Sequence, residues 1–180
     1  MINDQRLSQL VVIDVQDKLV DVMPKAEIKK MIEASHVLIE AAKILEVPCL
    51  STKQYPKGLG PTVKKLKSLF TAPSIEKKAF SCLDEPRFKS HLMKSRPQMI
   101  LCGLETHICI LQTALALKAA GKEVFVVEDA TLSRSSLHHQ NAIHRLRSEG
   151  IVVTNSESVM FEWLRVAEGD QFKAIAKLIK

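Results

Sequence analysis

The sequence predicts a doubly wound α/β domain, in which a mainly parallel β-sheet carries helices on both faces. Short apolar runs alternate along the chain with longer segments in which apolar residues recur at helical spacing. This alternation is typical of parallel strands joined by right-handed helical crossovers. The 180 residues are enough for one such domain, and no repeat or linker divides them. We therefore expect a single Rossmann-like domain over residues 1–180, built as three layers, α/β/α.

The first third of the chain supplies two strands, a long helix and a loop. Residues 8–14 form an apolar run that ends in a carboxylate, which indicates a buried strand. Residues 24–45 place isoleucines, leucines and alanines at helical spacing, which predicts a long amphipathic helix. A second apolar run over 47–52 indicates the next strand. Residues 54–61 contain two prolines and two glycines, and we expect them to form a loop.

The middle of the chain carries shorter elements. Residues 62–70 predict a short basic helix, and residues 74–80 a short extended piece. A charged helix is expected over 85–95. The run 97–102 follows it and is mostly apolar, which is typical of a third core strand.

The C-terminal part continues the alternation of helices and strands. Two of its helices are expected to end at glycines, which favour the left-handed conformation just beyond a helix. The expected helices are 105–120, 136–148, 158–166 and 170–179, and the expected strands are 123–128 and 151–154.

Composition excludes several classes of function. The net charge of +6 is modest and the chain has one Tyr and one Trp, so we expect no nucleic-acid partner. No apolar run approaches the roughly 18 residues of a membrane span, and the first residues lack the features of a secretory signal. Four irregularly spaced cysteines fit neither a disulfide framework nor a zinc site. We therefore expect free thiols, no membrane partner and a cytoplasmic location.

Polar residues follow several of the predicted strands. They include Asp14, Gln54, Asp129 and Arg134, together with the turn 103–109. In an open parallel sheet, ligands bind beyond the carboxyl ends of the strands, so these residues are expected to converge on one edge. The glycine-rich phosphate-binding patterns are absent, which argues against a nucleotide site.

Cys109 lies near the expected start of the helix 105–120. Unpaired N–H groups and the positive end of the helix dipole favour a thiolate at such a position. The thiolate is the form that attacks a carbonyl carbon. The alternative is that Cys109 is a small buried apolar residue without a chemical role.

Four segments resemble the isochorismatase-like cysteine hydrolases, the superfamily of isochorismatases, nicotinamidases and N-carbamoyl amidohydrolases. They occur in the family's order and span most of the chain. The loop 52–60 resembles that of isochorismatase-domain proteins without a known substrate. The four segments are VVIDVQ at 11–16, EKKAFS at 76–81, CGLETHIC at 102–109 and VVEDATLSR at 126–134.

The resemblance implies a catalytic triad of Asp14, Lys77 and Cys109. Asp14 matches the aspartate of the first segment, and Cys109 matches the nucleophile of the third. Lys77 matches the family lysine by its distance from an aromatic–serine pair, and the adjacent Lys78 is the second choice. A carboxylate can accept the thiol proton and later give it to a leaving amine, while an ammonium group stabilises both partners.

The same resemblance implies the rest of the site. It predicts a cis peptide bond between Leu104 and Glu105, and an oxyanion hole formed by the backbone N–H groups of Glu105 and Cys109. We further expect Gln54 to donate to the substrate. The side chains of Phe80, Leu104 and Tyr55 are expected to form the pocket walls.

No metal or other cofactor is expected. Nicotinamidases carry a metal-binding Asp-x-His-Pro after the second strand, and residues 53–56 of this chain read Lys-Gln-Tyr-Pro. His138, His139 and His144 show no metal-binding spacing. His107 lies close to Cys109, but the resemblance implies no role for it as a base. In the loop 53–56, Lys53 and Tyr55 stand where the metal-binding aspartate and histidine would be, so both of these ligands are missing.

The predicted function is hydrolysis of a small amide or carbamoyl C–N substrate through a thioester at Cys109. The alternative is a catalytically idle member of the family that binds or assembles. Apolar residues of 158–166 occupy more than one helix face, and a second layer must cover them. That layer is either another subunit, giving a homo-oligomer of at least two chains, or the final helix of the same chain.

Overall fold

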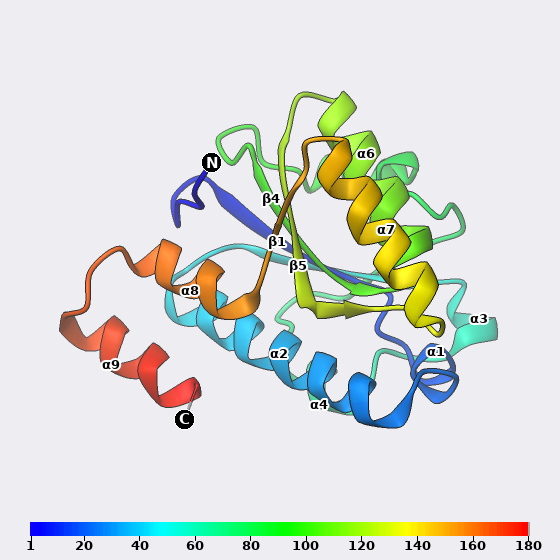
Figure 1. Ribbon diagram of the computed structural model, residues 1–180, viewed down its shortest axis with the longest axis horizontal. Coiled ribbons are helices and arrows are strands. Elements are labelled where there is room, and N and C mark those ends of the chain that lie inside the picture. Colours follow the sequence, from blue (N-terminus) through cyan, green and yellow to red (C-terminus); the bar gives the residue numbers. More distant parts are fainter. Residues whose placement is uncertain (180) are drawn as a thin grey trace.

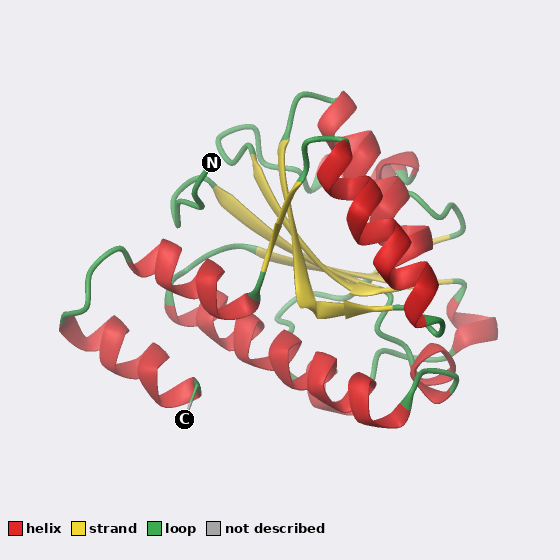
Figure 2. Cartoon of the chain, in the orientation of Figure 1, coloured by secondary structure: helices red, strands yellow, loops and turns green. Residues whose placement is uncertain are grey.

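The computed structural model describes residues 1–179 and confirms the predicted α/β fold. All six strands form one parallel sheet in the order β3-β2-β1-β4-β5-β6. Figures 1 and 2 show the sheet between two groups of helices. The strands are β1 Ser8–Ile13, β2 Cys49–Gln54, β3 Ile75–Lys77, β4 Gln98–Leu104, β5 Glu123–Leu132 and β6 Val152–Thr154.

Helices cover both faces of the sheet because alternate strand residues point to opposite sides. On one face the apolar side chains of β1, β4 and β5 pack against α2, α4, α8 and α9. On the other face they pack against α5, α6 and α7. The helices are α1 Asp17–Asp21, α2 Lys25–Ile44, α3 Pro56–Leu59, α4 Lys64–Lys67, α5 Pro86–Ser90, α6 Leu111–Ala119, α7 Ser136–Ser148, α8 Ser156–Leu164 and α9 Gly169–Leu178.

Several predicted boundaries differ from the structure. The expected helix 85–95 is reduced to Pro86–Ser90, and the expected loop 54–61 contains the short helix α3. The short helix α1 was not expected from the sequence. The expected helix 105–120 begins with a π-helical turn, Thr106–Ile110, before α6 starts.

Gly103 lets strand β4 continue two residues beyond its expected end. It pairs with Ile13 on β1 at a φ of +118°, a value that side chains disfavour. A Cβ atom at this position would lie 2.0 Å from the carbonyl oxygen of Ile13. The missing side chain therefore permits the close approach of β1 and β4 directly before the turn that carries Cys109.

The apolar C-terminal region is covered largely within one chain. Trp163 of α8 is buried, and its indole N–H donates to Ser8 Oγ at 3.0 Å. Ile175 of α9 is also fully buried in the same core. Trp163, an apolar residue of the expected helix 158–166, is therefore covered by its own chain. No helix within residues 1–179 is both long enough and apolar enough to cross a bilayer.

Candidate active site

The carboxyl ends of four neighbouring strands bring the three predicted triad residues together. Asp14 follows β1 and adopts a left-handed conformation with φ of 53°. Lys77 is the last residue of β3, and Cys109 lies in the π-helical turn after β4. Their side chains are buried at this edge of the sheet.

A buried ion pair forms the centre of the site. Lys77 Nζ lies 2.6 Å from Asp14 Oδ2, and both side chains are fully shielded from solvent. Thr52 Oγ1 donates to the other carboxylate oxygen of Asp14 at 2.8 Å. Lys77 Nζ also lies 3.6 Å from Cys109 Sγ. Breaking a buried pair leaves an uncompensated charge, so removal of either partner is strongly destabilising.

Lys77 has more acceptors around it than it has hydrogens. Besides Asp14 and Cys109, its Nζ lies 2.6 Å from Gln54 Oε1. The carbonyl oxygens of Ala79 and Phe80 are each 3.2 Å away. The alternative candidate Lys78 is exposed and its backbone carbonyl accepts from Gln54. The structure therefore places Lys77, and not Lys78, beside the cysteine.

Electrostatics around Cys109 favour a neutral thiol in the resting site. Burial raises the pKa of Cys109, and the negative charge of Asp14 raises it further against the opposing effect of Lys77. Burial lowers the pKa of Lys77, but Asp14 and Cys109 outweigh that effect and the net shift is upward. The sequence argument for a thiolate at a helix start is thus wrong for this site. Attack by the sulfur requires a proton acceptor, and Asp14 is adjacent.

The turn that carries Cys109 follows a cis peptide bond between Leu104 and Glu105. The cis bond agrees with the expectation from the family resemblance. The backbone N–H of Ile110 donates to the Glu105 carbonyl at 3.3 Å, which closes a π-helical turn. Single π turns inside helices are frequent at functional sites.

Side chains tie this turn to the segment between β5 and α7. The Glu105 carboxylate is buried and accepts from the backbone N–H of Arg134 at 3.0 Å. His107 Nδ1 lies 2.9 Å from Ser133 Oγ, and burial lowers the pKa of this imidazole. Thr106 makes a similar contact with a histidine of α7. These contacts fix residues 105–107, the segment that carries the candidate donor Glu105 and leads to Cys109.

Of the four predicted pocket residues, Tyr55 lines the cavity described below, whereas Leu104 and Phe80 do not. Gln54 uses its amide oxygen on Lys77 and its amide nitrogen on the Lys78 carbonyl, so it is engaged within the protein. Leu104 is fully buried in the core beneath α2 and lines no part of the cavity described below. Phe80 is 52% exposed and lies outside that lining as well.

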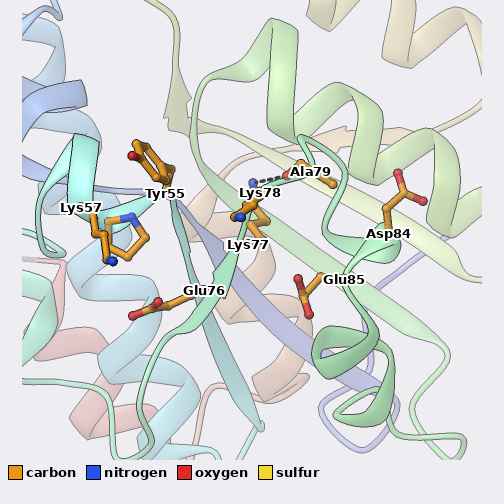
Figure 3. A pocket seen from close by; sticks show the side chains of 9 residues that line it. Tyr55, Lys57, Glu76, Lys77, Lys78, Ala79, Asp84 and Glu85 are labelled. Atoms are coloured by element: carbon orange, nitrogen blue, oxygen red, sulfur yellow. Dashed lines mark hydrogen bonds between the residues drawn. The ribbon is translucent and has the colours of Figure 1, made fainter.

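A cavity of about 550 Å³ has Lys77 in its wall, whereas Asp14 and Cys109 do not line it. Tyr55 lies on one side of it, with Asp84 and Glu85 on the other (Figure 3). Tyr55 is 53% exposed, and its ring lies so close to Gly58 that a Cβ there would be 2.6 Å away. The wall carries both signs of charge. It is lined by Tyr55, Pro56, Lys57, Glu76, Lys77, Lys78, Ala79, Asp84 and Glu85.

Asp129 does not join the site, although the sequence placed it at the same sheet edge. Strand β5 continues past it to Leu132, and its carboxylate accepts from Ser156 N–H at 2.8 Å and from Ser156 Oγ at 2.6 Å. It therefore holds the start of α8.

Thr52 and Gln16 were missed as site residues, because a single Thr or Gln carries no catalytic signal in a sequence. No group of three His, Cys, Asp or Glu side chains within residues 1–179 is arranged to hold a metal ion.

Comparison with known proteins shows the same family along most of the chain. A family model for the isochorismatase domain matches residues 8–158. Isochorismatase domain-containing protein 2 of Bos taurus is 39% identical over 176 residues, which cover 96% of this chain and 83% of that protein.

Two solved structures extend the comparison. The MAR1 ribonuclease of Caenorhabditis elegans is 35% identical with a TM-score of 0.92, over 99% of this chain and 92% of that one. The YcaC gene product of Escherichia coli, an octameric hydrolase of unknown specificity, is 25% identical with a TM-score of 0.92, over 99% and 89% of the two chains. The protein described here therefore belongs to the isochorismatase family of hydrolases.

Proposed function

We propose that this protein hydrolyses a small amide or carbamoyl C–N bond by nucleophilic catalysis at Cys109. The observation that carries the proposal is the buried contact of Lys77 Nζ with Asp14 at 2.6 Å and with Cys109 Sγ at 3.6 Å. A carboxylate and an ammonium beside a neutral thiol supply a proton acceptor and a compensating charge.

The chemistry proceeds in two halves. As Cys109 Sγ bonds to the substrate carbonyl carbon, Asp14 takes the thiol proton, and the backbone N–H groups of Glu105 and Cys109 hold the developing oxyanion. Collapse breaks the C–N bond, Asp14 passes the proton to the leaving nitrogen, and a thioester remains. Water then attacks the thioester, Asp14 takes a water proton and returns it to the sulfur, and the acid leaves. Lys77 stays charged throughout and stabilises the negative charge of Asp14.

The test is a panel of small primary amides and carbamoyl compounds, assayed for ammonia release. Loss of turnover in Cys109→Ala is expected, together with a mass increase on Cys109 when the wild-type enzyme is quenched during turnover. Unchanged turnover in Cys109→Ala would overturn the nucleophile assignment. Absence of turnover on the whole panel would favour the catalytically idle alternative.

A second candidate activity is RNA cleavage, because a solved structure 35% identical over nearly the whole chain is titled a ribonuclease. Exposed Lys57 and Lys78 border the cavity, but Glu76, Asp84 and Glu85 share the same wall and repel phosphates. We keep the proposal that nucleic acid is not a partner. Cleavage of labelled RNA that disappears in Cys109→Ala would replace the C–N proposal.

We also propose that the protein is a cytoplasmic homo-oligomer that needs neither metal nor other cofactor. The octameric relative supports assembly, and four cysteines without a disulfide agree with a reducing compartment. Light scattering is expected to give at least twice the chain mass of 20.1 kDa. A mass of one chain at micromolar concentration would contradict assembly. Phe172 of α9 is only partly buried, so the mass of Phe172→Glu tests whether α9 contributes to the contact between subunits.

A further inference from the structure

Gln54 holds both ends of its amide on the segment that carries Lys77. Its Oε1 accepts from Lys77 Nζ at 2.6 Å, and its Nε2 donates to the Lys78 carbonyl at 2.6 Å. The two contacts fix the orientation of the amide, because only the nitrogen end can donate to a carbonyl. The oxygen end therefore faces the ammonium group.

The backbone of Gln54 is fixed in turn by Gln16, which is fully buried. Gln16 Oε1 accepts from Gln54 N–H at 2.7 Å, and Gln16 Nε2 donates to the Gln54 carbonyl at 3.0 Å. The same Nε2 also donates to the Gly60 carbonyl at 2.8 Å. Gln16 lies two residues after Asp14, so the main chain connects these hydrogen bonds to the residue that supplies the triad carboxylate.

We propose that Gln54 is a positioning residue that aims the Lys77 ammonium between Asp14 and Cys109. This inference rests on the proposed function. Lys77 Nζ makes its two shortest contacts, both 2.6 Å, with Asp14 and Gln54. The amide oxygen of Gln54 is neutral, so it can accept one hydrogen of the ammonium while the positive charge still pairs with the Asp14 carboxylate. Of the remaining two N–H groups, one faces Asp14. The other faces the sulfur at 3.6 Å and the carbonyl oxygens of Ala79 and Phe80 at 3.2 Å.

The competing role is the one expected from the sequence, a direct contact with substrate. The two roles differ in a measurement that involves no substrate. Lys77 lowers the pKa of Cys109 against burial and Asp14, so a poorly aimed ammonium makes the thiol harder to ionise. Alkylation of Cys109 by iodoacetamide then becomes slower at a given pH.

The experiment measures the iodoacetamide labelling rate of Cys109 from pH 7 to 10 by peptide mass spectrometry. It compares the wild-type protein with Gln54→Met, which keeps the length but removes the acceptor. Labelling of Gln54→Met at pH 8 is expected to be at least about threefold slower, a rise of about half a unit in apparent pKa. Gln54→Asn, whose amide is one methylene shorter, is expected to shift in the same direction and serves if Gln54→Met does not fold.

The matched control is Lys53→Gln, on the same strand, where the ammonium pairs with Glu76 at 3.3 Å and away from the triad. Its labelling profile is expected to equal that of the wild type. Profiles of Gln54→Met and Gln54→Asn that match the wild type would overturn the inference, and a rise in KM alone would then assign Gln54 to the substrate. Failure of the proposed function is seen separately, as turnover that persists in Cys109→Ala.

Discussion

Gly103→Ala tests whether the close pairing of β1 and β4 supports the site. The new Cβ would lie 2.0 Å from the carbonyl oxygen and 2.7 Å from the nitrogen of Ile13. These are backbone atoms of a central strand, so no side chain can move aside. A residue with a Cβ at φ of +118° costs about 1–3 kcal/mol, and overpacking adds about 1–3 kcal/mol. We expect the free energy of unfolding to fall by about 2–6 kcal/mol.

Equilibrium denaturation in urea measures this loss, and Gly121→Ala is its matched control. Gly121 also has a positive φ, of +79°, but a Cβ there would meet nothing within 4 Å. Its substitution is expected to cost only about 1 kcal/mol, from the backbone conformation alone. Equal losses in the two variants would refute the reasoning, because the clash with Ile13 would then contribute nothing. Turnover of Gly103→Ala is expected to fall as well, since Asp14 directly follows Ile13.

Other predictions concern the triad, the buried thiols and metal. Cys109→Ala, Asp14→Asn and Lys77→Ala are each expected to lower kcat by at least about 10³-fold, whereas Lys78→Ala keeps most activity. The reverse result for the two lysines would shift the assignment by one residue. Asp14→Asn and Lys77→Ala also break a buried ion pair. We expect thermal unfolding to show that the free energy of unfolding falls by about 3–5 kcal/mol in each variant. Burial raises the pKa of Cys82 to about 11, so the folded state keeps a proton that the unfolded chain loses from about pH 9. Stability from this group is present below pH 9 and falls between about pH 9 and 11, by up to about 1.4 kcal/mol per pH unit. Cys82→Ala should therefore show a shallower loss of melting temperature from pH 8 to 10.5, and an identical slope would contradict the assignment. Treatment with EDTA is expected to leave turnover and melting temperature unchanged, and loss of both together with a bound metal would disprove a metal-free site.

Some features of the site required no structure to predict. Asp14, Gln54 and the turn to Cys109 each follow an apolar run, and parallel strands bring such positions to one edge. The family resemblance implied Lys77 by its spacing before Phe80 and Ser81, and the structure places this lysine beside Cys109. The structure confirms that these residues lie together, and their catalytic roles stay predictions.

Other expectations failed because they depended on how deeply a side chain is buried. Cys109 was expected to be a thiolate from its place near a helix start, but burial and the charge of Asp14 raise its pKa. Leu104 was expected in a pocket wall, yet the strand extends through Gly103 and turns its side chain into the core. The sequence left open whether another subunit covers residues 158–166, and in the structure Trp163 of this segment donates to Ser8, 155 positions away in the same chain.

The sequence by itself determined the fold class, the family and the identity of Asp14, Lys77 and Cys109 as candidates. Hydrophobic periodicity predicted the fold class. The resemblance of four segments to the isochorismatase-like hydrolases implied the family and the three candidate residues. Only the tertiary structure decided that the amide of Gln54 faces Lys77, and that Gln16 supports it. The direction of a side chain and the field around a charge depend on residues that are distant in sequence, and packing alone brings those residues together.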